Sequence, residues 1–216
     1  MARAGAAEGL WLRAGSQTGG KGRNGRQWIS PPGNLYTTTL VRLQPSDPFA
    51  PSLALVAAIA LHETASAYAA ERKLTLKWPN DLLYDGAKLA GILLEREDDA
   101  VAVGIGVNLA HRPDVPDRPA TDLALLTGAA PDPATFLDDL AASFDRWLGA
   151  WRGEGLGVIR GEWLRRAHPV GAALSVSLAG EKIDGLFDGL DEAGALRLRL
   201  ADGEVRVIQA GDVFLL

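Results

Sequence analysis

The dipeptide Asp85-Gly86 is the feature that most constrains the fold, because it separates two apolar runs by a two-residue turn. Asp-Gly is a strong signal for a tight turn between antiparallel strands. The sequence therefore predicts a β-hairpin formed by residues 81–84 and 88–96. Lys88 opens the second strand, which is otherwise apolar at its start. A lysine that faces inward there needs an anionic partner; the alternative is an edge lysine whose ammonium group reaches water.

Hydrophobic periodicity predicts the elements around this hairpin. Alternating β-branched residues indicate a strand at 35–42. Apolar residues at helical spacing indicate a long helix from an N-cap at Ser52 to about Arg72. The other predicted elements are strands at 10–13, 74–77 and 100–108 and helices at 133–151 and 158–167. Together they predict an α+β fold, with a mixed β-sheet flanked by helices.

The pattern changes at about Pro169, where short apolar segments begin to alternate with glycines at regular spacing. The strands expected in this part are 174–178, 182–190, 196–200, 205–208 and 213–216. Such spacing is typical of a small β-barrel. We therefore expect two domains, residues 1–168 and residues 169–216.

The composition narrows the classes of function. A formal net charge of −5 over 216 residues argues against generic nucleic-acid binding through a basic surface. The absence of cysteine excludes disulfides, thiolate metal sites and a cysteine nucleophile. Because no secretory signal opens the sequence and its apolar stretches are too short to span a bilayer, we expect a cytoplasmic protein without a membrane partner. Its three histidines are scattered, which disfavours a metal site.

Positive charge is concentrated in the glycine-rich stretch GGKGRNGRQW at residues 19–28. Glycine lets the backbone approach a ligand closely. The cations Lys21, Arg23 and Arg26 can neutralise a phosphate, and the indole of Trp28 can stack on a base. Alone the stretch is only moderately specific, because arginine-glycine runs also occur in flexible tails that bind nucleic acid.

Three further segments follow in order, namely KWPND at 77–81, KLAGIL at 88–93 and GIGVN at 104–108. Together the four segments resemble the signature of the biotin protein ligases, over about residues 8–216. The resemblance implies a biotin/lipoate ligase-like catalytic domain, related to class II aminoacyl-tRNA synthetases, and a small C-terminal SH3-like β-barrel. It also implies the activity of a biotin–[acetyl-CoA-carboxylase] ligase. Such an enzyme activates biotin with ATP and Mg²⁺ to biotinyl-5′-AMP and attaches it to a lysine of a biotin carboxyl carrier protein domain.

The resemblance also implies roles for individual residues. Both steps bring anions together, so fixed cations are most valuable where charge develops. The expected catalytic residues are Lys88, Arg23 and Asp81, and Asp81 is also a candidate magnesium ligand. The expected biotin-binding residues are Gln17, Gly20, Lys21, Gly22, Arg23, Lys88 and Gly106. The expected nucleotide-binding residues are Arg23, Arg26, Trp28, Asn80 and Asn108.

Some of these residues have simpler explanations when taken one at a time. Gln17 alone is typical of a solvated loop, and Asn80-Asp81 after a proline is also an ordinary turn. Lys21 and Asn24 stand where the family typically has arginine. Lysine keeps the charge but loses the planar fork of guanidinium, and Asn24 leaves one phosphate contact open.

Other interpretations remain beside this one. The chain could be a lipoate-type ligase, or an impaired relic that binds biotin or nucleotide; an RNA-binding loop ranks last. The family's Ser-Thr turn, which contacts the biotin head, is not found before Gln17, so we expect an incomplete biotin site from either a natural truncation or a start placed too far downstream. No helix-turn-helix precedes the catalytic domain, so no DNA partner is expected. Homodimerisation is left open.

Overall fold

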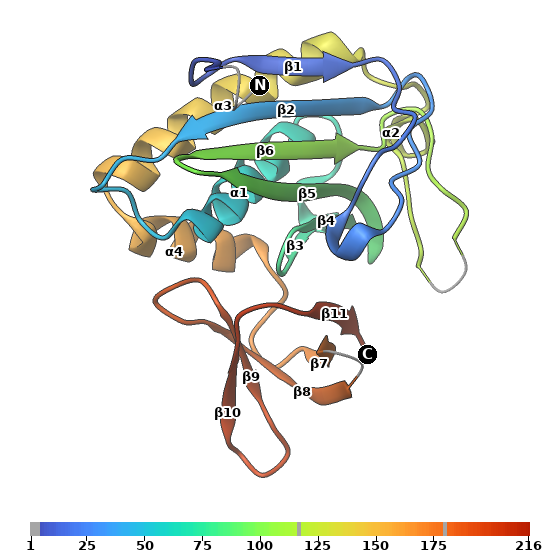
Figure 1. The fold of residues 1–216 in the computed structure, drawn as a ribbon. Coiled ribbons are helices and arrows are strands. Elements are labelled where there is room, and N and C mark those ends of the chain that lie inside the picture. Colours follow the sequence, from blue (N-terminus) through green and yellow to red (C-terminus); the bar gives the residue numbers. More distant parts are fainter. Residues whose placement is uncertain (1–4, 116–117, 179–180) are drawn as a thin grey trace.

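The computed structural model describes residues 5–115, 118–178 and 181–216. These residues form two sheets, which lie one above the other in Figure 1. The larger sheet has the strand order β1-β2-β6-β5-β4-β3. Its strands are β1 (Trp11–Ala14), β2 (Leu35–Arg42), β3 (Leu74–Lys77), β4 (Asp81–Tyr84), β5 (Ala87–Glu97) and β6 (Ala100–Val107).

The predicted hairpin of β4 and β5 is confirmed. Asp85 and Gly86 both have positive φ, 52° and 83°, as the tight turn that suits twisted antiparallel strands requires. The pairing shifts register between Leu82 and Leu83, so that Leu83 lies opposite Lys88. The bulge leaves Leu89 without an opposite residue on β4, while Lys88 pairs with Leu83 on one side and with the loop residue Ala120 on the other.

The large sheet is not mixed in the way the sequence analysis expected. Among the described residues, every ladder between its strands is antiparallel. Parallel pairing is confined to two isolated bridges, Leu76 with Ala167 and Lys88 with Ala120. The reason lies in the connections from β3 to β6, which are only two or three residues long. Parallel neighbours need a crossover of a dozen residues or more.

Helices cover one face of the large sheet. They are α1 (Leu53–Ser66), α2 (Leu123–Thr127), α3 (Pro133–Gly153) and α4 (Leu156–Arg166). Figure 1 shows α1, α3 and α4 behind the sheet, and side chains such as Ile59 and Phe136 are fully buried there. None of the helices in the described ranges is long and apolar enough to cross a membrane.

The helix predicted from Ser52 to Arg72 begins nearly where expected but ends at Ser66. Ser52 occupies the N-cap position, as predicted, but its side chain makes no capping hydrogen bond: the hydroxyl donates to Phe49 O at 2.6 Å and accepts from Trp151 Nε1 at 2.8 Å. Ser52 already lies in a 3₁₀ turn with helical φ and ψ, whereas a capping residue is usually extended. At the other end the chain must leave the helix early to return to the start of β3.

The C-terminal sheet has the order β10-β9-β8-β7-β11. Its strands are β7 (Ala173–Leu178), β8 (Glu181–Leu190), β9 (Leu196–Arg199), β10 (Val205–Ile208) and β11 (Asp212–Leu215). All five predicted strands are therefore present, but the predicted barrel is not closed, because no ladder joins β10 to β11 among the described residues. The chain beside β11 contacts the glycine-rich loop of the other domain instead.

Candidate active site

A cavity of about 740 Å³ lies between the large sheet, the glycine-rich loop and strand β11. It is lined by every residue that the sequence analysis assigned to the site, from four segments far apart in the chain. These residues are Gln17, Gly20, Lys21, Gly22, Arg23, Arg26, Trp28, Asn80, Asp81, Lys88, Gly106 and Asn108. The structure thus brings the predicted site together, while the role of each residue stays a prediction.

A carboxylate between two ammonium groups forms the charged centre of the cavity. Lys88 Nζ lies 2.5 Å from Asp81 Oδ1, and Lys77 Nζ lies 3.2 Å from Asp81 Oδ2. Burial alone would raise the pKa of Asp81, but the two ammonium groups outweigh it, and the pKa lies below its usual value. The trio therefore carries one net positive charge at neutral pH. Of the two lysines Lys88 is the more accessible, because 34% of its side-chain surface is exposed against 19% for Lys77.

The indole of Trp28 lies flat on a pair of glycines. Gly91 and Gly106 face each other across β5 and β6. A Cβ added at Gly106 would lie 2.7 Å from Trp28 Cε2, and one at Gly91 would lie 3.3 Å from Trp28 Cζ3. Gly106 must therefore be glycine for this contact to form, whereas a side chain at Gly91 would require its neighbours to shift by a few tenths of an ångström. Lys88 Nζ lies 5.4 Å from the centre of the same indole ring, and Trp28 Nε1 is buried with no hydrogen-bond partner among the described residues.

The base of the glycine-rich loop is closed by contacts that the sequence analysis did not identify. Trp28 N donates to Gly20 O at 2.9 Å, and Gln17 N donates to Ser30 O at 3.4 Å. Ser30 Oγ lies 2.9 Å from Gln17 Oε1. A Cβ at Gly20 would lie 2.5 Å from Trp28 O. The close approach of these two backbone segments therefore requires glycine at position 20. Ser30 orients the amide of Gln17, and no motif signalled it.

The tip of the loop contacts the C-terminal sheet. Arg23 Nη1 donates to Gly211 O at 3.1 Å, Arg26 forms an ion pair with Asp212, and Asn24 Nδ2 lies 3.5 Å from the same carboxylate. Asn24 has a φ of 57°, a left-handed conformation that asparagine adopts more readily than arginine. Burial lowers the pKa of Arg23, while nearby carboxylates, Asp212 foremost, oppose the shift.

The KWPND segment contacts the C-terminal sheet and carries Asp81. The Trp78-Pro79 peptide is cis, and Trp78 Nε1 donates to Gly194 O of the C-terminal sheet at 3.1 Å. Trp78 is buried, as predicted. Asn80 Nδ2 lies 2.5 Å from Ile92 O on β5, so its amide N–H already has a backbone partner. The second N–H of the same NH₂ group and Asn80 Oδ1 are left for other partners.

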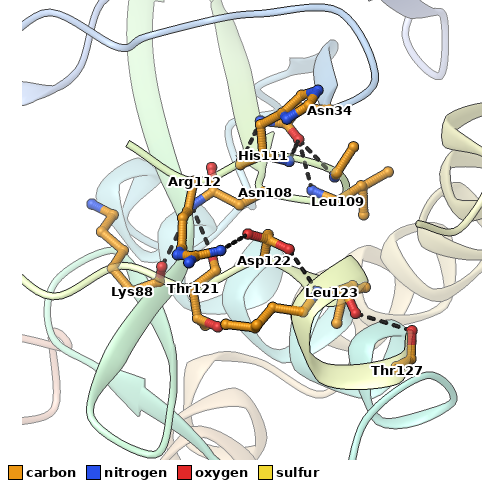
Figure 2. Close-up of polar contacts among 12 residues, drawn as sticks. Asn34, Lys88, Asn108, Leu109, His111, Arg112, Thr121, Asp122, Leu123 and Thr127 are labelled. Carbon is orange, nitrogen blue, oxygen red and sulfur yellow. Dashed lines mark hydrogen bonds and ion pairs between the residues drawn. The ribbon is translucent and has the colours of Figure 1, made fainter. Parts of the chain in front are cut away.

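Asn108 holds the backbone around Lys88 (Figure 2). It is 2% exposed, and its Nδ2 lies 3.1 Å from Thr121 O and 3.4 Å from Lys88 O. Thr121 N donates to Lys88 O at 2.9 Å, and Lys88 N donates to Pro119 O at 2.8 Å. Helix α2, which the sequence analysis missed, follows directly. Asp122 caps it through Leu125 N at 2.7 Å, and an acidic N-cap was the signal for it.

The cavity is suited to an anionic ligand, because Lys77, Lys88 and the loop cations line it. Residues 7–110 match the biotin/lipoate A/B protein ligase family, and residues 175–216 match the biotin protein ligase C terminal domain. The chain belongs to the biotin protein ligase family.

Individual relatives agree with this. The chain is 41% identical over 215 residues to a biotin–[acetyl-CoA-carboxylase] ligase of Paracoccus denitrificans, covering 94% of this chain and 89% of the relative. It is 32% identical to the ligase of the same name from Mycobacterium tuberculosis, covering 95% and 79%. A solved biotin protein ligase from Aquifex aeolicus, in complex with biotin and ATP, is similar with a TM-score of 0.86 and 27% identity, over 98% of this chain and 91% of that one.

Proposed function

We propose that this protein activates biotin with ATP to biotinyl-5′-AMP and then transfers biotin to a specific lysine of a biotin carboxyl carrier protein domain. The observation that carries the proposal is the ion pair of Lys88 with Asp81 inside a cavity closed by the loop of residues 19–28. The names of the Paracoccus and Mycobacterium relatives, and the biotin and ATP in the Aquifex complex, support it.

In the first step the biotin carboxylate attacks the α-phosphorus of ATP, and pyrophosphate leaves. Lys88 would approach both anions, since one of its N–H donors already points to Asp81 and its exposed side faces the cavity. Arg23 and Arg26 would bind phosphate oxygens after leaving Gly211 and Asp212. In the second step the carrier lysine amine attacks the carbonyl carbon of the mixed anhydride, and AMP leaves.

Asp81 would act on this chemistry through Lys88. It fixes the position of the ammonium group at the cavity through their 2.5 Å contact. Gln17, oriented by Ser30, would bind the ureido head of biotin, which offers both donors and acceptors. Gly106 would let biotin approach β6 next to the ring of Trp28.

Magnesium would arrive as part of the MgATP substrate. Both oxygens of Asp81 lie within 3.2 Å of a lysine nitrogen, so the carboxylate is already neutralised. Within the described ranges, no three acidic or histidine side chains cluster in a way that could hold a metal ion. Magnesium is readily bound through phosphate oxygens and water instead. The residues present therefore do not favour Asp81 as a dedicated magnesium ligand.

The two parts of the chain support a division into domains at residues 168 and 169. Each part has its own sheet, and the C-terminal part contributes β11 to the cavity wall. The C-terminal match to a biotin protein ligase domain favours biotin over lipoate. Because ATP and the carrier domain are cytoplasmic, we place the reaction in the cytoplasm.

The test is a transfer assay with two acids. The purified chain is incubated with MgATP, a biotin carboxyl carrier domain and either biotin or lipoate, and the mass of the carrier is measured. We expect the mass of one biotinyl group on the carrier with biotin and none with lipoate. A lipoylated carrier would replace the proposal with the lipoate alternative. Binding of biotin without any pyrophosphate release would favour the impaired relic.

A further inference from the structure

Asn34, at the entry to β2, binds the turn that follows β6 (Figure 2). The side chain is buried, with 3% of its surface exposed. Its Oδ1 accepts hydrogen bonds from three consecutive backbone N–H groups, Leu109 at 3.0 Å, Ala110 at 2.9 Å and His111 at 2.9 Å. Its Nδ2 donates to His111 O at 2.8 Å. One amide group thus fixes a whole turn of backbone.

This turn continues directly into the residues that hold Lys88. Asn108 precedes it, and Asn108 N donates to Leu89 O at 3.0 Å. Ala124 N donates to Leu109 O at 2.8 Å, which binds the first turn of α2 to the same segment. The ladder between β5 and β6 ends at Ala90 and Val107, and beyond it residues 119–121 hold the backbone of Lys88. Asn34 therefore lies at one end of a short chain of hydrogen bonds whose other end is Lys88.

We propose that Asn34 is a positioning residue for adenylate formation. It fixes the turn at 109–111, and through Asn108 and Thr121 it sets the place of the Lys88 backbone. Asn34 is not among the residues that line the cavity, so it acts through other residues and does not touch the substrates. The inference rests on the proposed function. A displacement of about 1 Å at a reacting group can cost on the order of 10²-fold in rate.

The test compares two substitutions of Asn34. Asn34→Leu keeps the approximate size but removes the acceptor. Asn34→Asp keeps an oxygen that can accept all three N–H groups and loses only the single donor to His111 O. The three donors favour a buried carboxylate. Thr39→Val is the matched control, because Thr39 is a buried residue on β2 whose hydroxyl donates to Leu10 O at 3.1 Å away from the cavity.

Pyrophosphate release is measured at saturating biotin and MgATP, at a temperature where circular dichroism shows each variant folded. We expect Asn34→Leu to lower kcat roughly 10- to 100-fold, with the KM for biotin changed by less than about threefold. Asn34→Asp should restore kcat to within about threefold of wild type, and Thr39→Val should match wild type. An unchanged kcat in Asn34→Leu, or an equal loss in Asn34→Asp, would overturn the proposal.

A second readout does not depend on activity. Hydrogen exchange of the amides of residues 109–111 should speed up in Asn34→Leu and stay slow in Asn34→Asp. Retained protection in Asn34→Leu would also overturn the positioning role. Failure of the proposed function has a different signature: wild-type protein would release no pyrophosphate, while the exchange difference between the two variants would persist.

Discussion

Two cationic regions meet in the cavity, and they are built in different ways. The centre of Lys88, Asp81 and Lys77 lies on paired strands, and its contacts connect residues at most seven positions apart along the chain. The glycine-rich loop at 19–28 is largely exposed, and its tip contacts the C-terminal sheet 186 to 188 positions away. The difference indicates that Lys88 is placed before ligands bind. The loop arginines, in contrast, must exchange a protein partner for phosphate.

The largest expected effect is that of Lys88→Ala. It removes the exposed ammonium group from a centre that is otherwise in place, so pyrophosphate release should fall about 10²- to 10³-fold, as for the loss of a donor to a developing oxyanion. Lys73→Ala is the matched control, because Lys73 also pairs with an aspartate, at 3.1 Å, but does not line the cavity. Pyrophosphate release near the wild-type rate from folded Lys88→Ala protein would contradict the assignment.

Asp81→Asn should have the next largest effect. Two ammonium groups would lose their shared counter-ion, and we expect a loss of roughly 1–3 kcal/mol in stability, less than for a fully buried pair because the lysines are partly exposed. Urea unfolding measures it.

Because the pKa of Asp81 is lowered on folding, its contribution is present above the unfolded pKa and is lost as the pH falls through the folded one. The stability difference between wild type and Asp81→Asn should therefore shrink in acid. Asp85→Asn, which affects an exposed ion pair, should leave stability at neutral pH nearly unchanged. If Asp85→Asn lowered stability as much as Asp81→Asn, the site carboxylate would contribute no more than a surface one, which would contradict this account.

Asp212→Asn should loosen the loop and leave the Lys88 centre intact. An ion pair as exposed as that of Asp212 with Arg26 contributes about 0.2–1 kcal/mol. Trypsin should therefore cut after Arg23 or Arg26 a few times faster in the free variant than in free wild type. Biotin with MgATP should slow cleavage in both proteins. Asp184→Asn, on the exposed side of β8, serves as the control. If it accelerated tryptic cleavage as much as Asp212→Asn, the effect would not come from the ion pair of Asp212 with Arg26.

The smallest expected effect concerns His168, which lies at the domain junction. Burial, with a smaller contribution from Lys77, lowers its pKa to about 4 from 6.5. The unfolded state therefore takes up a proton between these values and the folded state does not. Stability from His168 is complete above about pH 6.5 and declines as the pH falls towards 4. Between pH 7.5 and pH 5 the free energy of unfolding should fall by about 1 kcal/mol less in His168→Gln than in wild type, allowing for the partial exposure of the imidazole. Urea unfolding at the two pH values measures the difference.

Local signals in the sequence predicted the strand-built region well. The strands at 35–42 and 74–77 have the predicted bounds, and the Asp85-Gly86 turn placed Lys88 at the head of β5. These features depend on alternation and on turn chemistry between neighbouring residues. The closed barrel was wrong because barrel closure depends on the pairing of strands at the two edges, which spacing along the chain does not reveal.

The contacts that shape the rest of the site connect distant residues. Nothing near Asp212 in the sequence indicates that it pairs with Arg26, and nothing near Asn34 indicates a bond to residues 109–111. Ser30 beside Gln17 was likewise not signalled. Each of these partners is defined by tertiary folding, so family motifs identified residues that line the cavity and not the residues that orient them.

Hydrogen exchange in the free protein and with biotin plus MgATP tests the contrast between the two regions most directly. Four glycines in the loop make its free state costly to order, and its cations repel one another without an anion. We expect protection of residues 19–28 to rise strongly with both ligands, while residues 87–92 around Lys88 keep the protection that they have in the free protein. Unchanged protection of the loop, or an equal rise in protection of both segments, would contradict the account. In that account Lys88 is in place before ligands bind and the loop closes on the nucleotide.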